Sequence, residues 1–140
     1  MAFSNKISIL GSNFGNMRKK IELEYIFSSS IKVLFSRLST AAGLAEWFAD
    51  DVLQREGKFI FVWDRIEHPA LLLEQKNNVF VRFQWEDAEE GEYFEFNIHV
   101  QPLTEDVALL ITDFTDAEDE TDTIELWNKQ IEMLHRTLGA

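Results

Sequence analysis

The chain has 140 residues, 46% of them hydrophobic, and carries a formal net charge of −12 with no cysteine. This length predicts one domain that can bury roughly 70% of the surface its unfolded chain would expose. The negative charge repels nucleic acid phosphates and anionic membrane surfaces, and the lack of cysteine excludes disulfides and Cys-ligated zinc. No apolar run reaches membrane-spanning length. We therefore expect a cytoplasmic protein that neither binds nucleic acid nor inserts into a membrane.

The N-terminal residues differ from the rest of the chain. Residues 1–16 contain serine, asparagine and glycine with little periodicity, and a regular strand pattern starts directly after Met17. We expect either an upstream extension or an N-terminal arm over residues 1–16. A single domain is expected over residues 17–140.

A strand followed by two short helices is predicted after Met17. Apolar and polar residues alternate over 20–27, which indicates a half-buried strand. Serines at 28–30 are N-cap candidates for one short helix, and Ser39 and Thr40 are candidates for a second. Gly43 weakens or bends this second helix, whose apolar residues would share one side.

Six further segments have the length and apolar pattern of strands, with short turns between them. They are residues 52–56, 59–63, 70–75, 79–85, 93–101 and 107–113. Consecutive strands with short connections predict an antiparallel meander. Pro69 lacks the N–H that a fully paired central strand requires, so we expect a strand start or a bulge there.

The last 19 residues of this pattern, 120–138, predict one long helix. Its apolar residues recur three and four positions apart, which places them on one face: Ile124, Trp127, Ile131, Leu134 and Leu138. The expected fold class is therefore α+β. A curved antiparallel sheet of about six or seven strands would wrap this C-terminal helix, with the two short helices after the first strand.

Three groups of residues resemble the START-like (SRPBCC) superfamily, in the branch related to activators of the Hsp90 ATPase and to polyketide cyclases. The first is the segment 25–39 followed by Gly-Leu-Ala-Glu-Trp-Phe at 43–48, and the second is Gly-Lys-Phe-Ile-Phe-Val-Trp at 57–63. The third is the pair of segments 81–85 and 107–114, which precede the helix that contains Trp127. The resemblance covers the chain from Met17 to about Leu138.

The resemblance implies a helix-grip fold that holds a hydrophobic small molecule or lipid between the sheet and the C-terminal helix. Relatives often have a histidine late in the penultimate element, and Asp113 occupies that position here. Chemistry assigned to that histidine therefore cannot be transferred to this chain.

Few residues suggest catalysis or metal binding. His68, His99 and His135 are scattered and lack the spacing of a metal-ligand pair, so we expect no metal, no cofactor and no assigned catalytic residue. Asp50 and Asp51 fit either a pocket mouth, where carboxylates could act as acid and base, or a hydrated helix terminus.

An apolar set with one acid remains as the candidate ligand-binding site. Its members would face the interior: Trp47, Phe61, Trp63, Phe83, Trp85, Phe96, Ile98, Ile111, Asp113, Trp127 and Ile131. Ligand pockets are mostly apolar with a few placed polar groups, but the same residues equally describe a filled core.

Three functions are compatible with this pattern. The first is a binding protein for a hydrophobic small molecule. The second is a co-chaperone-like interaction domain with a filled core, acting as a homodimer or with a protein partner. The third is an enzyme of the cyclase or aromatase kind, which the lack of a convergent catalytic set disfavours.

Overall fold

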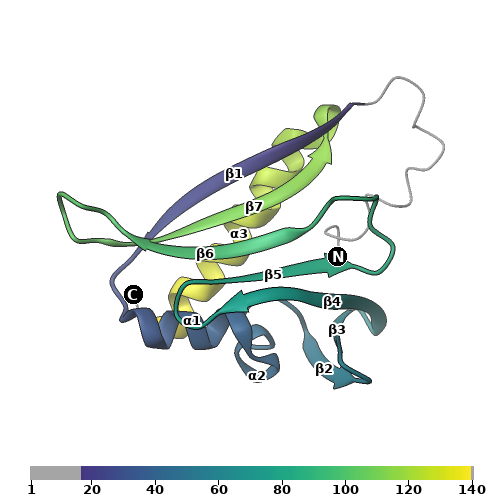
Figure 1. The fold of residues 1–140 in the computed structure, drawn as a ribbon, viewed down its shortest axis with the longest axis horizontal. Helices are drawn as coiled ribbons and strands as arrows, with labels where there is room; N and C mark the ends of the chain where they lie inside the picture. The colour runs from purple at the N-terminus through teal and green to yellow at the C-terminus, as the bar shows by residue number, and fades with distance from the viewer. Residues whose placement is uncertain (1–16, 140) are drawn as a thin grey trace.

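The computed structural model of the protein describes residues 17–139, which form one seven-stranded antiparallel sheet and three α-helices (Figure 1). The strands are β1 (Arg18–Phe27), β2 (Asp51–Arg55), β3 (Lys58–Trp63), β4 (Ile66–Lys76), β5 (Phe80–Trp85), β6 (Phe94–Val100) and β7 (Val107–Asp116). The helices are α1 (Ile31–Ser39), α2 (Ala41–Leu44) and α3 (Glu120–Leu138), with the 3-10 turn η2 (Ala117–Asp119) before α3. The expected α+β class and helix-grip arrangement are confirmed. The expected extension over 1–16 lies outside the described residues.

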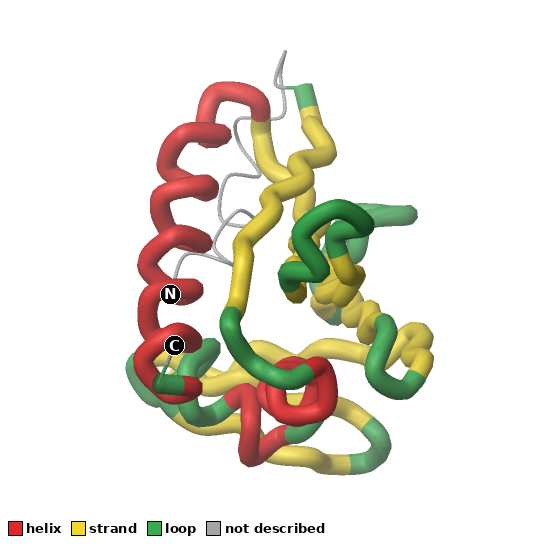
Figure 2. Tube along the Cα trace, turned by 90° about the vertical axis from the view of Figure 1, so that its left-hand side faces the viewer, coloured by secondary structure: helices red, strands yellow, loops and turns green. Residues whose placement is uncertain are grey.

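The strand order is β1-β7-β6-β5-β4-β3-β2, so the first two strands of the chain form opposite edges of the sheet. β1 pairs along its full length with β7, from Arg18 opposite Asp116 to Phe27 opposite Val107. The connection through α1 and α2 therefore carries the chain from one edge of the sheet to the other. Figure 2 shows α3 along one side of the curved sheet, with α1 and α2 near its end.

The expectation that a strand starts or bulges at Pro69 is wrong. β4 begins at Ile66, Pro69 lies opposite Ile60 of β3, and the register shift falls between Leu72 and Glu74. The carbonyl of Pro69 accepts from the N–H of Glu86, just after β5, at 2.9 Å. The N–H and carbonyl of one strand residue point toward the same neighbouring strand, so the nitrogen of Pro69 also faces the β5 side. Pairing with β5 starts only at Ala70, so the proline removes no ladder bond there.

The two short helices begin as their sequences predict. The hydroxyl of Ser30 accepts from the N–H of Val33, and the hydroxyl of Thr40 accepts from the N–H of Gly43. α2 is shorter than the apolar spacing suggested, because the chain turns after Leu44. A Cβ at Gly43 would lie 2.2 Å from the carbonyl oxygen of Ser36, so α2 can approach α1 only with glycine there.

α3 packs its apolar stripe against the concave face of the sheet. Trp127, Ile131 and Leu134 are buried, and Ile124 and Leu138 pack at the margins of the same core. Acidic residues occupy the first turn and His135 and Arg136 the last, which suits the helix dipole. The stripe read from the sequence is therefore confirmed.

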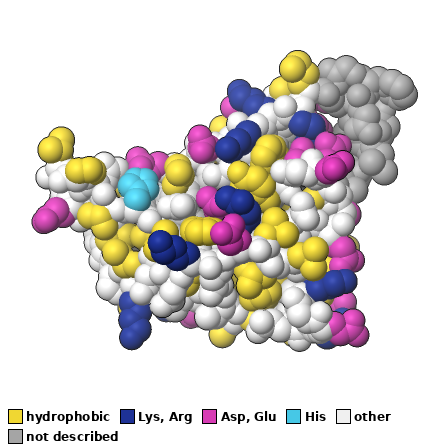
Figure 3. Space-filling view, in the orientation of Figure 1, with side chains coloured by type: hydrophobic (Ala, Val, Ile, Leu, Met, Phe, Trp, Pro, Cys, Tyr) yellow, Lys and Arg dark blue, Asp and Glu magenta, His cyan; other side chains and the backbone are white. Residues whose placement is uncertain are grey.

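The outer face of the sheet, which faces the viewer in Figure 3, carries acidic, basic and apolar side chains side by side. Ion pairs link β5 to β6 and β1 to the β5–β6 connection. Arg82 of β5 binds Glu95 of β6 at 2.7 Å, and Arg18 of β1 binds Glu92 at 2.6 Å. Within residues 17–139, no helix is both long enough and apolar enough to cross a membrane.

Replacing Gly43 with alanine should destabilise the protein by about 1–3 kcal/mol, because the new methyl group overlaps the backbone of α1. Urea denaturation measures this change. Ala42→Ser, at the exposed neighbouring position, is the control and should stay within about 0.5 kcal/mol of the wild type. A neutral Gly43→Ala would show that α1 and α2 approach each other less closely than described.

Replacing Trp127 with alanine should cost about 3–5 kcal/mol, because this side chain is only 1% exposed. Lys129→Ala, on an exposed position of the same helix, should change the free energy of unfolding by less than about 0.5 kcal/mol. A small effect of Trp127→Ala in the same denaturation experiment would mean that the ring borders open space.

Candidate functional site

Phe48 lies at the centre of the aromatic core, in the connection between α2 and β2. Its ring contacts six other rings, with centroid distances of 5.3–5.9 Å: Trp47, Phe61, Trp63, Phe94, Phe96 and Trp127. The partner on α3, Trp127, stacks on it at an interplanar angle of 19°. One side chain thus joins the short helical segment, the sheet and α3.

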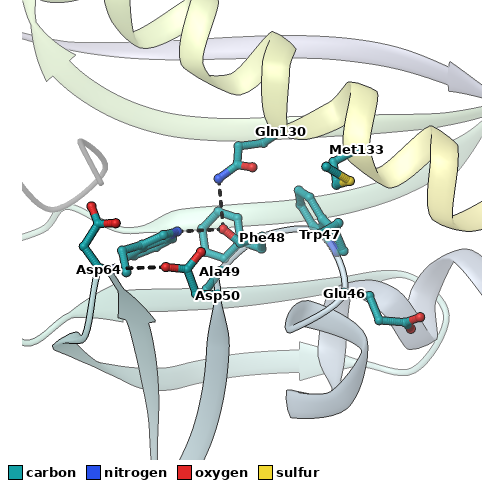
Figure 4. Close-up of a pocket in the computed structure, with 9 residues that line it drawn as sticks. Glu46, Trp47, Phe48, Ala49, Asp50, Asp64, Gln130 and Met133 are labelled. Atoms are coloured by element: carbon teal, nitrogen blue, oxygen red, sulfur yellow. Dashed lines mark hydrogen bonds between the residues drawn. The ribbon is translucent and has the colours of Figure 1, made fainter.

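The backbone of Phe48 makes the same three-way connection. Its carbonyl oxygen accepts from the indole N–H of Trp63 on β3 at 3.0 Å and from the side-chain amide of Gln130 on α3 at 2.9 Å (Figure 4). Two neighbouring bonds hold the chain that follows. The N–H of Asp50 donates to the carbonyl of Val62, and a carboxylate oxygen of Asp50 accepts from the N–H of Asp64.

A pocket of about 240 Å³ opens beside these bonds, between the α2–β2 connection, the β3–β4 turn and α3. Its wall consists of Glu46, Trp47, Phe48, Ala49, Asp50, Trp63, Asp64, Gln130 and Met133. Met133 is 40% exposed there, although it is apolar, whereas the indole rings that share the pocket are buried. Figure 4 shows the Met133 side chain next to Trp47. The pocket therefore offers an apolar wall with polar groups at its edges.

The sequence-predicted site residues all lie in the interior. Each of the eleven is at most 7% exposed: Trp47, Phe61, Trp63, Phe83, Trp85, Phe96, Ile98, Ile111, Asp113, Trp127 and Ile131. Their rings contact one another, for example Phe61 with Trp85 at 5.3 Å and Phe96 with Trp127 at 5.9 Å. Trp47 and Trp63 also line the pocket. The role of the eleven as ligand contacts stays a prediction.

Asp113 is the polar member of that interior set and is bonded to protein groups. One carboxylate oxygen accepts from the indole N–H of Trp127 at 3.0 Å, and the other accepts from the N–H of Phe114 at 2.8 Å. These bonds offset the cost of burying a carboxylate and fix the position of the Trp127 ring on β7. Two polar side chains of β5 are bonded as well: Arg82 donates to the carboxylate of Glu95, and the Gln84 amide donates to the carbonyl of Glu92.

Gln130 and Met133 also line the pocket, although neither was predicted from the sequence. Both lie beside the apolar stripe of α3, and with Trp127 they form a row at three-residue spacing, which is a signal that could have identified them. For Asp50 the sequence left two positions open, a pocket mouth and a hydrated helix terminus, and the structure places Asp50 in the pocket wall. Asp51 instead bonds the N–H of Val52 at the start of β2 and does not line the pocket.

The remaining titratable candidates are dispersed. Burial lowers the pKa of His68, whose ring lies 5.5 Å from that of Trp63, and this favours the neutral imidazole. The ring of His135 stacks on Phe27, and His99 pairs with Glu24 on the outer face. Across residues 17–139, no three His, Asp or Glu side chains form a group that could hold a metal ion.

A second pocket, of about 340 Å³, lies between α1 and the β4–β5 turn. It is lined by Lys32, Phe35, Ser36, Ser39, Thr40, Gln75, Asn77 and Asn78. The hydroxyls of Ser36, Ser39 and Thr40 already donate to carbonyls of the preceding helical turn. This pocket therefore offers fewer available polar groups than its composition suggests.

Comparison with known proteins identifies the family. The START-like superfamily domain matches residues 16–140. Protein BfR322 from Bacteroides fragilis is 37% identical, with a TM-score of 0.61, over 86% of this chain and 90% of its own. No curated protein matches the chain.

Two other solved structures share the fold at lower identity. The Aha1 dimer from Colwellia psychrerythraea has a TM-score of 0.69 at 15% identity, over 86% of this chain and 96% of its own. Protein BH1534 from Bacillus halodurans has a TM-score of 0.65 at 14% identity, over 88% of this chain and 98% of its own. The seven-stranded sheet with α3 packed against it fits the family match over residues 16–140. This chain therefore belongs to the START-like superfamily.

Proposed function

We propose that this protein binds a small hydrophobic molecule, and that binding occurs at the pocket beside Phe48. START-like folds often bind hydrophobic ligands. The pocket lies between α3 and the part of the chain formed by the α2–β2 connection and the β3–β4 turn. The observation that carries the proposal is the exposed Met133 side chain, which lies next to Trp47 in the wall of this pocket. A ligand that covers such apolar surface gains about 0.8 kcal/mol per buried methylene group.

The size of the pocket limits the ligand. About 240 Å³ is slightly below the range of roughly 300–1,000 Å³ that is typical of small-molecule sites. A short apolar chain or a single ring therefore fits best. A larger lipid would reach Phe83 or Ile98 only if the packed rings around Phe48 separated.

A protein-interaction role is the second candidate, and exposed apolar residues on β4 support it. Ile66, Leu71, Leu72 and Leu73 are 38–60% exposed along this one strand. Exposed apolar side chains can contribute to contact surfaces, and Leu71 and Leu72, which point to opposite faces of the sheet, would contact a partner on both sides of β4. A second copy of the chain or a co-chaperone-type partner would be the occupant. Sedimentation velocity over a range of concentrations tests for the homodimer.

Titration with 1-hexanol, followed by amide chemical shifts, tests the ligand-binding proposal. We expect saturable shifts for Ala49, Gln130 and Met133, because these residues line the pocket. Met133→Ala should weaken the affinity about threefold to tenfold, since it removes several methylene-sized groups from the wall. Val33→Ala is a matched control, because Val33 is an apolar helical residue with similar exposure that lies outside the pocket.

Two results would contradict the proposal. Shifts that increase linearly to the solubility limit of hexanol would show that no site is being filled. Equal loss of affinity in Met133→Ala and Val33→Ala would show that hexanol binds elsewhere or without specificity.

A further inference from the structure

The charged side chains that line the pocket are all acidic. They are Glu46, Asp50 and Asp64, and neither lysine nor arginine contributes to the wall. The three come from two separate connections, 45–50 and 64–65, so the grouping results from the fold and not from one acidic run. The pocket therefore combines an apolar wall with a negatively charged edge.

The Asp50 carboxylate is held in place by the backbone N–H of Asp64, which joins the two connections. Asp50 donates its N–H to Val62 at 3.0 Å and accepts the N–H of Asp64 at 2.9 Å. Asp64 lies at the tight β3–β4 turn, with a φ of 52°. Figure 4 shows Asp50 and Asp64 on the same side of the pocket.

The same two carboxylates are not neutralised by neighbouring cations. Glu46 pairs with Arg37 at 3.0 Å, but among residues 17–139 no lysine or arginine pairs with Asp50 or Asp64. Their negative potential therefore acts on whatever enters the pocket. The net charge of −12 reinforces it over a longer range.

We propose that this pocket selects small organic cations: ligands with a protonated or quaternary amine on a short apolar body. The apolar body would cover Met133 and the pocket wall, and the amine would lie at Asp50 and Asp64. An anionic head group would instead meet the two carboxylates of Asp50 and Asp64, which no lysine or arginine of residues 17–139 neutralises. This inference rests on the proposed function, because it concerns the ligand class of the same pocket.

Three probes with the same apolar chain test the inference on the full-length protein: hexylammonium, 1-hexanol and hexanoate. Near pH 7 and at low salt, we expect hexylammonium to bind about threefold to tenfold more tightly than hexanol, as two partly exposed ion pairs allow. Hexanoate should bind more weakly than hexanol. Raising the salt concentration from about 20 to 150 mM should reduce these differences, because the charges are screened.

Asp50→Asn and Asp64→Asn should each reduce the preference for hexylammonium and leave the affinity for hexanol nearly unchanged. Asparagine at position 50 keeps an oxygen that can accept the N–H of Asp64, so the turn is preserved. Asp87→Asn is the matched control, because it removes the same charge from an exposed residue outside the pocket. It should leave the preference intact.

The outcomes separate this inference from the proposed function. Saturable binding of hexanol, with equal affinity for all three probes, would overturn the inference and leave the proposed function standing. Loss of the preference in Asp87→Asn to the same extent as in Asp50→Asn would assign it to net charge, which also overturns the inference. Absence of saturable binding by any probe would contradict both.

Discussion

The structure depends on how Phe48 connects three elements. Its carbonyl oxygen bonds to Trp63 of β3 and to Gln130 of α3, and its ring stacks on Trp127. A carbonyl has two lone pairs, and both are used here by donors from different elements. Because backbone and side chain act together, the α2–β2 connection cannot shift without disturbing both the sheet and α3.

The position of the pocket follows from this connection. The rings around Phe48 fill the space between the sheet and the middle of α3, so apolar surface is left open at the margin, where Met133 extends beyond the packed rings. Asp113 contributes to the packed region, because its bond to Trp127 holds that indole against β7. The geometry favours a ligand at the rim of the core and limits how deep the ligand can enter.

Periodicity made most of the fold predictable from the sequence. The alternation over 20–27 and the stripe of α3 gave the correct elements, because each buries one face and the pattern records which face. The strand start or bulge expected at Pro69 was wrong, because β4 pairs with β5 only from Ala70 onward. The lack of an N–H at Pro69 therefore costs no bond to β5. The Phe48 contacts were not predictable, since bonds to a backbone carbonyl leave no pattern in residue type. For Asp50 the sequence left a pocket mouth and a hydrated helix terminus open, and Asp64 is brought to the same pocket only by the β3–β4 turn.

The central claim is that an apolar ligand binds at the rim beside Phe48 and not within the ring cluster. Intermolecular nuclear Overhauser effects from bound hexanol to assigned methyl groups test it most directly. We predict contacts to the methyl groups of Met133 and Ala49, which line the pocket. Contacts to Ile98 or Ile111, which are buried in the interior, would show that the core opens around the ligand and would contradict this account.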